Sequence, residues 1–572
     1  MTSKASLNNF HPALNLYRYS VKRTLGLTVL ITVFLLLVCP GYTLMLINNE
    51  LKHNYTGGIS DIYNFDALSN ELVMLVTAVT TASALLYLFI NFAFLYGRSS
   101  GDFFHSLPLK RKGLLFSRFF ASLAPLTVPM VLTYASMCGI LSLDNVEGSF
   151  KPIILGFIFN IIIMLSCCAF SMIFIVCAGS TFDLIVSFFT FNVGMIFVQL
   201  ICCDLCREFL TGFPSGSMRN FLYFSTPFFY SFAKCYTVLT DEIDIAAQAI
   251  IFIVKLALIT VISLIAAYLL YKRRKSEKSG VSYAYRFIYI ICGVIVGIVG
   301  AYGLGMVFSN GTYNVFFWIF AVIGGLLAAV TFGAINDRGF KTVKKSLIMG
   351  GCSTAAVALA CLLLWSGGFG YTSKIPSEDS IKSVEVRFNK CDAVFDDPTL
   401  PIKLHKAIID GSDDFSYENY LDTVYINYTL ENGSKLCREF EVDNENADIL
   451  LEIFKSSENI KSVRKELDDL DLSNLSIYVY GDDDEFIDGA YLTTAELKKI
   501  AEAYISDIPN ATSETIMGSY DLNFEIQGID SDNQYRYRDF YIDKSFENTL
   551  NAIESLNLKE RVSADDTEKV LQ

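Results

Sequence analysis

The sequence predicts a polytopic α-helical membrane protein with about nine transmembrane helices and a C-terminal α+β domain of repeated β-hairpin–helix units. Apolar runs of about 20 residues recur through residues 1–370, and each is long enough to cross a hydrocarbon core of ~30 Å. Charge divides the chain at the same point. Residues 1–370 carry 25 Lys and Arg against 15 Asp and Glu, whereas residues 371–572 carry 20 against 44. An acidic soluble part argues against nucleic acid as a partner, because phosphates attract clustered Lys and Arg.

The membrane part is predicted to hold a six-span core, residues 24–271, and three additional spans within residues 272–370. Ahead of the first span, apolar residues recur at helical spacing: Phe10, Leu14, Tyr17 and Val21. Residues 1–23 are therefore predicted to form a cytoplasmic amphipathic helix on the inner leaflet of the lipid bilayer, with a frayed polar leader as the alternative. The nine spans are placed at residues 24–47, 72–97, 119–141, 152–178, 184–203, 247–271, 287–308, 314–335 and 347–369.

The distribution of basic residues predicts the orientation, because Lys and Arg concentrate in cytoplasmic loops. With the N-terminus inside, nineteen Lys and Arg fall in inner segments and five in outer loops. Nine spans then make residues 371–572 an acidic extracytoplasmic domain, and the expected location is the plasma membrane. The inner residues are Lys4, Arg18, Lys22, Arg23, Arg98, Lys110, Arg111, Lys112, Arg118, Lys272, Arg273, Arg274, Lys275, Lys278, Arg286, Arg338, Lys341, Lys344 and Lys345; the outer ones are Lys52, Lys151, Arg207, Arg219 and Lys234.

The acidic domain is predicted to contain three hairpin–helix units. The first hairpin, residues 423–442, turns at Asn432-Gly433, a strong turn signal. The helices are predicted to begin after N-caps at Asp443, Thr493 and Asp543, 50 residues apart each time. A fixed period indicates duplicated modules, and a coincidence of alternating elements is the alternative. The second and third hairpins are placed at residues 476–492 and 521–542.

Fourteen cysteines are present, most of them inside spans, where thiols behave as small apolar groups. Two pairs share a predicted outer segment, and each is a candidate disulfide: Cys206 with Cys235, and Cys391 with Cys437. The acidic run 482–488 lacks the ligand spacing and central Gly of a calcium loop, so it is interpreted as a solvated hairpin tip. No metal site is predicted.

The sequence contains no catalytic signature: no GxxxxGK[ST] phosphate loop, no GxSxG and no HExxH. Lys255 lies well inside a predicted span, where charges are costly and often functional. It is a candidate for a transport path. The alternatives are that its long stem snorkels to the interface, or that the span starts later than residue 247.

The second inner loop, DFFHSLPLKRKGLLFSR at residues 102–118, is the most informative segment. A cytoplasmic loop alone explains its basic triplet but not two adjacent phenylalanines on the water side. Apolar residues beside a basic cluster predict a docking surface for another protein. Two phenylalanines resting on the membrane interface are the alternative. The predicted docking residues are Phe103, Phe104, His105, Ser106, Leu107, Pro108, Lys110, Arg111 and Lys112.

The stretch HSLPLKRKGLLFSRF, residues 105–119, resembles the loop before span three of ABC-2 type transporter permeases. Members of that family often carry Ser-Leu-Pro, then basic residues, then Ser-Arg or Ser-Lys. The six-span core, the leader helix and the outer loop before span six also have counterparts, over residues 8–271. Residues 272–572 depart from the minimal family pattern and look like the appended portion of large permeases from Gram-positive bacteria.

The resemblance implies a permease subunit of an ABC exporter that pairs with a second permease subunit, as a homo- or heterodimer, and docks a separate ATP-binding subunit. ATP and Mg would be held by that partner, so this chain would carry no cofactor and no catalytic residue. It implies export of an amphiphile such as an antimicrobial peptide, a drug or a lipid-linked molecule. A membrane-anchored sensor, or an envelope-binding protein that uses the acidic domain, is the alternative.

Overall fold

A computed structural model of the chain describes residues 2–53, 60–143, 150–214, 226–240, 245–389, 391–411, 420–469, 471–479, 485–490, 494–517, 522–529 and 535–555. The chain separates into two compact units. The membrane unit comprises residues 1–203 and 218–360, and the sheet unit comprises residues 204–217 and 361–572. Two helices, α7 and α13, begin in the membrane unit and end in the sheet unit.

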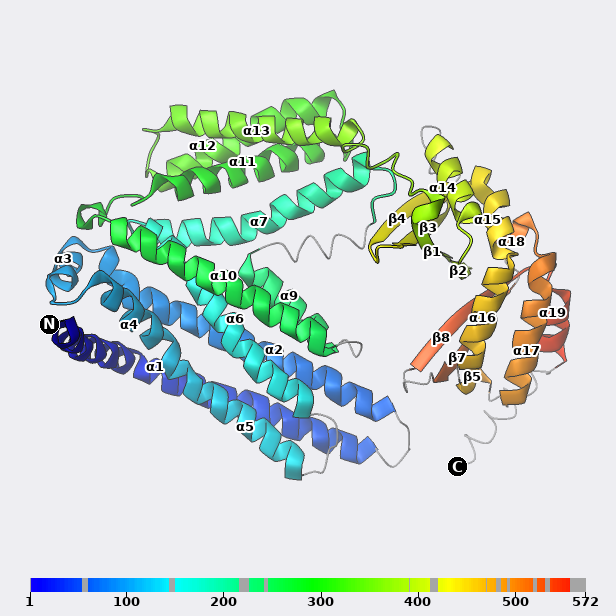
Figure 1. Ribbon diagram of the computed structural model, residues 1–572, viewed down its shortest axis with the longest axis horizontal. Coiled ribbons are helices and arrows are strands. Elements are labelled where there is room, and N and C mark those ends of the chain that lie inside the picture. The colour runs from blue at the N-terminus through cyan, green and yellow to red at the C-terminus, as the bar shows by residue number, and fades with distance from the viewer. Residues whose placement is uncertain are drawn as a thin grey trace. The chain divides into compact units, whose positions relative to one another are not determined.

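Among the described residues, nine helical segments are long and apolar enough to cross a membrane, which confirms the predicted polytopic helical class (Figure 1). The third span is built from α4, a 3-10 turn at Pro125 and α5, because proline cannot donate the helical hydrogen bond there. The helices are α1 (Thr2–His53), α2 (Ser60–Phe92), η2 (Ala93–Leu95), α3 (Arg98–Ser106), α4 (Arg111–Leu123), η3 (Ala124–Leu126), α5 (Thr127–Leu143), α6 (Phe150–Cys177), α7 (Thr181–Phe209), α9 (Pro227–Thr240), α10 (Ile245–Arg273), η4 (Ser276–Lys278), α11 (Arg286–Phe308), α12 (Val315–Asn336) and α13 (Val343–Trp365).

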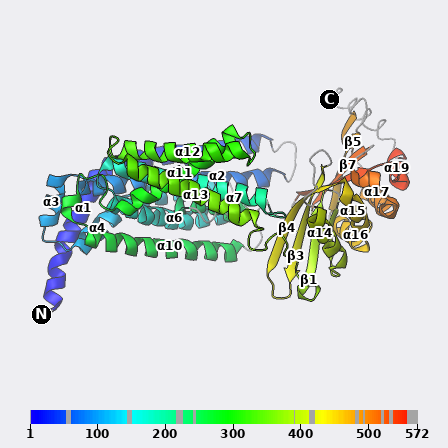
Figure 2. The same ribbon diagram turned by 90° about the horizontal axis from the view of Figure 1, so that it is seen from above.

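The helices that could cross a membrane differ from the predicted spans at several ends, among them the first, which begins at Ala13, the third and the fifth. The third span begins at Arg111 and the fifth at Thr181, so Arg118 and Asp183 lie inside membrane-capable helices. Both side chains are buried. The predicted leader is not set off from the first span: α1 is unbroken at residue 23, and Figure 2 shows its N-terminal turns at a steep angle to the other helices of the membrane unit.

Helix α9 is a short helix and not a tenth span. Its 14 residues rise ~21 Å, which is less than the ~30 Å of a hydrocarbon core. Its aromatic residues pack against longer helices: Phe228 lies 5.4 Å from Phe188 of α7, and Tyr230 lies 5.8 Å from Phe252 of α10, measured between ring centroids.

Helix α7 is packed on two sides within the membrane unit. Phe188 and Phe191 meet Phe174 of α6, with ring centroids 5.9 and 5.3 Å apart. On the other side Gly194 lies so close to α11 that a Cβ there would be 2.4 Å from Ile295. In Figure 1, α7 accordingly runs between α10 and the layer formed by α11, α12 and α13.

The sheet unit contains two four-stranded antiparallel sheets with the same strand order, β2-β1-β3-β4 and β6-β5-β7-β8 (Figure 2). The three predicted hairpins are present as β3–β4, β5–β6 and β7–β8; the hairpin β1–β2 was not predicted. The strands are β1 (Ile381–Phe388), β2 (Cys391–Phe395), β3 (Tyr420–Leu430), β4 (Lys435–Asp443), β5 (Asp471–Val479), β6 (Glu485–Ala490), β7 (Leu522–Ile529) and β8 (Tyr535–Ile542).

Helices follow the hairpins and share one apolar core with both sheets. This core is continuous from Val384 on β1 to Phe540 on β8, so the two sheets belong to one domain. The helices are α14 (Thr399–Gly411), α15 (Ala447–Phe454), α16 (Ser457–Asp469), α17 (Thr494–Asp507), α18 (Ser513–Met517) and α19 (Glu547–Glu554).

The strand order indicates that the second sheet repeats the first, and the register of β7–β8 repeats that of β3–β4 100 residues later. Ile426 lies opposite Arg438 in β3–β4, and Ile526 lies opposite Arg538 in β7–β8. The repeating unit is therefore a pair of hairpins with their helices, twice the predicted length.

Two of the predicted cap residues act on backbone amides just ahead of a helix. Asp443 accepts a hydrogen bond from the Glu445 amide at 3.2 Å, and Asp543 accepts one from the Ser545 amide at 2.7 Å. Thr493 lies outside the described residues, as do residues 482–484 of the acidic hairpin tip.

Sheet order contradicts one of the two predicted disulfides. Cys391 on β2 and Cys437 on β4 lie on opposite edge strands, three strand spacings apart or ~14 Å. A disulfide needs Cα atoms within ~7 Å. Cys206 belongs to the sheet unit and Cys235 is buried in the membrane unit, and their pairing stays a prediction.

Candidate functional site

The predicted docking loop folds into helix α3 and a turn that leads into α4. Figure 1 shows α3 at the end of the membrane unit where α4 begins and α10 ends. Phe103 is 60% exposed, whereas Phe104 and His105 are half-buried. The Ser106 hydroxyl donates to the Phe103 carbonyl at 2.8 Å and closes the last turn of α3. The other predicted docking residues follow: Leu107 is half-buried, and Pro108, Lys110, Arg111 and Lys112 are exposed.

Phe104 is held from within by Arg118. The Arg118 guanidinium carbon lies 4.1 Å from the Phe104 ring centroid and 4.4 Å from that of Phe94, within cation–π range. Its Nη1 donates to the Asn91 carbonyl, and the side chain is 2% exposed. Because a buried cation is costly without compensation, these rings and this carbonyl stabilise it. Phe104 is therefore part of the fold of this loop.

Arg111 binds the C-terminal end of α10. Its Nη1 donates to the carbonyls of Tyr271, Lys272 and Arg274 at 3.4, 2.9 and 2.7 Å. The last carbonyls of a helix have no intrahelical partner and favour a cation. A residue predicted for docking thus also fixes the start of α4 to the end of the sixth span.

Arg274 is buried and binds backbone carbonyls at the ends of two further helices. Its Nη1 donates to the Ile175 and Val176 carbonyls at 3.3 and 2.7 Å, near the end of α6. Its Nη2 donates to the Leu95 carbonyl at 2.9 Å, at the end of η2, just ahead of α3. Arg111 and Arg274 together join the end of η2, the start of α4 and the ends of α6 and α10 into one junction, which we call the inner junction.

His105 contributes a neutral ring to this junction. Its ring centroid lies 6.1 Å from that of Tyr271 and 6.2 Å from that of Phe94. Burial, and then the charges of Arg111 and Arg274, lower the pKa of His105 below its ordinary value. The ring adds no positive charge to the two arginines at neutral pH.

Lys255 is an exposed residue of α10, and it is not part of the inner junction. Its side chain is exposed, and its Nζ lies 5.6 Å from the ring centroid of Tyr230 on α9. The aromatic face offers the ammonium a favourable contact. The transport-path and snorkelling interpretations both stay predictions.

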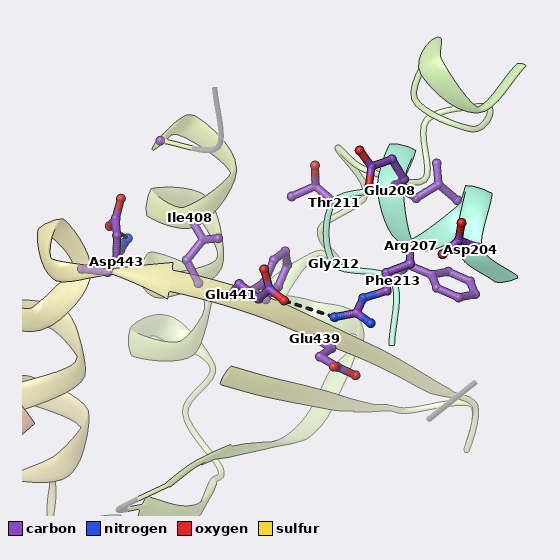
Figure 3. Close-up of a pocket in the computed structure, with 14 residues that line it drawn as sticks. Asp204, Arg207, Glu208, Thr211, Gly212, Phe213, Ile408, Glu439, Glu441 and Asp443 are labelled. Carbon is purple, nitrogen blue, oxygen red and sulfur yellow. Dashed lines mark hydrogen bonds and ion pairs between the residues drawn. The ribbon is translucent and has the colours of Figure 1, made fainter. Parts of the chain in front are cut away.

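The sheet unit has a cavity of about 440 Å³ of its own, between the end of α7, β4 and α14 (Figure 3). Its wall joins five carboxylates to one guanidinium, that of Arg207, and to apolar side chains. Figure 3 shows Arg207 directed toward Glu441, with Nη2 3.4 Å from Oε1. In the described parts of the chain, no group of three His, Cys, Asp or Glu side chains is placed to hold a metal ion. The carboxylates are those of Asp204, Glu208, Glu439, Glu441 and Asp443.

Sequence reasoning placed Arg118 and Arg274 in loops, among residues whose charge only sets the orientation. No local signal marks them, because the rings around Arg118 and the carbonyls bound by Arg274 come from distant segments of the chain. Comparison with protein-family models, with curated proteins and with solved structures finds no match to this chain.

Proposed function

We propose that this chain is the permease subunit of an ATP-driven exporter and that α3 binds its ATP-hydrolysing partner. One observation carries the proposal: Phe103 stands 60% exposed on a helix beside the inner junction, where Arg111 and the buried Arg274 hold the ends of neighbouring helices. Exposed aromatic side chains beside basic ones form the energetic centre of many protein interfaces. The likeness of residues 105–119 to the ABC-2 loop supports the same assignment.

The inner junction suits a surface that receives a push. A partner that closes on ATP moves its contact surface, and the receiving helix must pass that movement on without yielding. Arg111 and Arg274 join the start of α4 and the end of η2, which leads into α3, to the ends of α6 and α10 through charge-assisted hydrogen bonds, which are about twice as strong as neutral ones. Movement of α3 is thereby delivered to the third, fourth and sixth spans together.

ATP and Mg belong to the partner in this proposal, and the residues of this chain bind and transmit. A second permease subunit completes the path for an amphiphilic cargo such as an antimicrobial peptide, a drug or a lipid-linked molecule. Lys255, exposed on the surface of one membrane unit, is a residue that a second subunit or the cargo would meet.

The same proposal places the chain in the plasma membrane with its inner junction in the cytoplasm and its sheet unit outside. The excess of Lys and Arg in the segments around the inner junction supports this orientation. The two chain segments that make up the sheet unit support this orientation further. Residues 204–217 and 361–572 form one compact unit, and the four spans from α10 to α13 separate them, which returns the chain to the face where α7 ends.

Pull-down of the ATP-hydrolysing partner tests the proposal. Phe103→Ala should weaken binding at least tenfold, because truncation of a buried aromatic anchor often costs ~2 kcal/mol. Phe340→Ala is the matched control, since Phe340 is 74% exposed in the loop between α12 and α13, on the same proposed face. Equal recovery of the partner with the Phe103→Ala variant and the unaltered chain would show that α3 is not the docking site.

The second candidate function is a sensor or envelope-binding protein, which the acidic cavity of the sheet unit favours. Co-purification separates the two functions. An exporter subunit brings down an ATPase in stoichiometric amount, whereas a sensor or scaffold does not.

A further inference from the structure

The end of α7 is built into the sheet unit. Residues 204–213, which we call the strap, comprise the last turns of α7 and the four residues after it. The Glu439 amide donates to the Gly212 carbonyl at 3.3 Å, so the strap lies against the edge of β4. The Arg207–Glu441 ion pair lies beside this contact (Figure 3). Helix α7 begins in the membrane unit, and the residues that directly follow it bind the edge strand β4 of the sheet unit.

The strap fits its seat closely. Gly212 has a φ of +79°, and a Cβ there would lie 2.6 Å from the Phe440 ring. Leu210 fills the space beside Gly368, where a Cβ would lie 2.5 Å from it. The Phe213 ring centroid lies 6.3 Å from that of Tyr371. Apolar packing of this kind, and not the exposed ion pair, supplies the stability, because exposed pairs contribute only ~0–1 kcal/mol.

The segment after α13, residues 371–374, also binds β4. Arg438 of β4 is 1% exposed, and its guanidinium carbon lies 3.8 Å from the Tyr371 ring centroid. Its Nη2 donates to the carbonyls of Tyr371 and Lys374 at 2.6 and 3.1 Å. The strap and the segment 371–374 therefore meet on one strand.

We propose that the strap couples the fifth span to the sheet unit. Helix α7 is continuous from Thr181 to Phe209, so the chain has no loop between the membrane part of α7 and the strap. A displacement of the fifth span is delivered to β4, and a ligand that loosens β4 releases the fifth span. The coupling holds for an exporter and for a sensor alike, so its failure would leave the proposed function standing.

Hydrogen exchange of the full-length protein in lipid nanodiscs tests the seat of the strap. In the unaltered chain, peptides covering residues 204–213 and β4 should be protected. Gly212→Ala should speed exchange of both by at least about tenfold, because the new Cβ collides with Phe440. Gly433→Ala is the matched control: Gly433 has a φ of +78°, but a Cβ added there would meet nothing within 4 Å, so the change adds backbone strain without a collision. Arg207→Ala should change exchange less than threefold.

A second pair of variants tests the coupling itself. Gly194→Leu should push α7 away from Ile295 of α11 and raise exchange in the strap and β4. Gly303→Leu on α11 faces open space and should not. With Gly212→Ala already present, Gly194→Leu should add nothing, because the connection is already broken.

Two results would overturn the coupling. The first is exchange of residues 204–213 at unprotected rates in the unaltered chain, which would mean that the strap is not seated. The second is protection of β4 that does not respond to Gly194→Leu, which would mean that the strap is seated but transmits nothing.

Discussion

The inner junction and the strap join chain segments in opposite ways. At the inner junction, Arg111 and Arg274 donate to three backbone carbonyls each, and Arg274 is buried. The strap has a backbone hydrogen bond to β4 and an exposed ion pair, and its apolar contacts join Gly212 to Phe440, Leu210 to Gly368 and Phe213 to Tyr371. Hydrogen bonds in a buried site are costly to leave unmade, whereas apolar packing contributes through the surface that it removes from water. The inner junction therefore relies mainly on hydrogen bonds to helix ends, and the strap relies mainly on apolar packing.

The largest predicted effect is at the inner junction. Arg274→Ala leaves the carbonyls of Ile175, Val176 and Leu95 without their donor, and each unmade buried bond costs ~1–3 kcal/mol. Thermal unfolding in detergent should show a loss of roughly 3 kcal/mol or more. Arg273→Ala is the control, because Arg273 is exposed at the end of α10 and should change stability by less than ~0.5 kcal/mol. Equal melting temperatures for the two variants would show that the hydrogen bonds of Arg274 do not stabilise the membrane unit.

The next effect is a pH dependence of the sheet unit. His405 is fully buried against Phe440, the ring on which Gly212 is seated, with Nδ1 2.8 Å from the Tyr428 hydroxyl. Burial, and then the charge of Arg438, lower the pKa of His405 to about 4.

The unfolded chain binds this proton more readily than the folded one. Stability is therefore complete above the ordinary histidine pKa of ~6.5 and falls as pH drops toward 4, by on the order of 3 kcal/mol. Exchange in β4 and the strap should accelerate over this range, and His405→Gln should flatten the dependence. The arginines of the inner junction do not titrate in this range, but its His105 does, so the control for the sheet unit is the His405→Gln variant and not the inner junction. Acid sensitivity that survives His405→Gln would place the titrating group elsewhere.

The smallest effect is predicted for Lys255, an exposed cation outside the inner junction. Lys255→Met keeps the apolar stem and removes a charge whose contact is the Tyr230 ring at 5.6 Å. Melting temperature and partner recovery should stay unchanged within error. Loss of export with assembly intact would instead assign Lys255 to a transport path.

The spans could be predicted from the sequence because apolar length is a local property of the chain. The inner junction could not, since the value of Arg118 and Arg274 depends on carbonyls and rings from distant segments. The same limit explains the docking loop: Phe103 and Phe104 are adjacent and alike in sequence, but only the position of Arg118 decides which of them is covered.

The acidic domain shows a similar division. Turn and cap residues such as Gly433 and Asp443 act locally and were predicted correctly. The pairing of β1 with β3, and of β5 with β7, joins strands that are far apart in the chain, so the two-sheet duplication required the structure. The strap is non-local for the same reason, because residues 204–213 meet a strand more than 200 positions later.

Site-specific photo-crosslinking tests the central claim most directly. A photoreactive phenylalanine analogue at position 103 places the reactive group on the exposed side of α3, and the same analogue at position 340 serves as the control. In native membranes, position 103 should yield one dominant adduct with a nucleotide-binding ATPase, and position 340 should not. An adduct with lipid alone, or with a protein that hydrolyses no ATP, would contradict the assignment of α3 as the docking surface of an ATP-driven exporter.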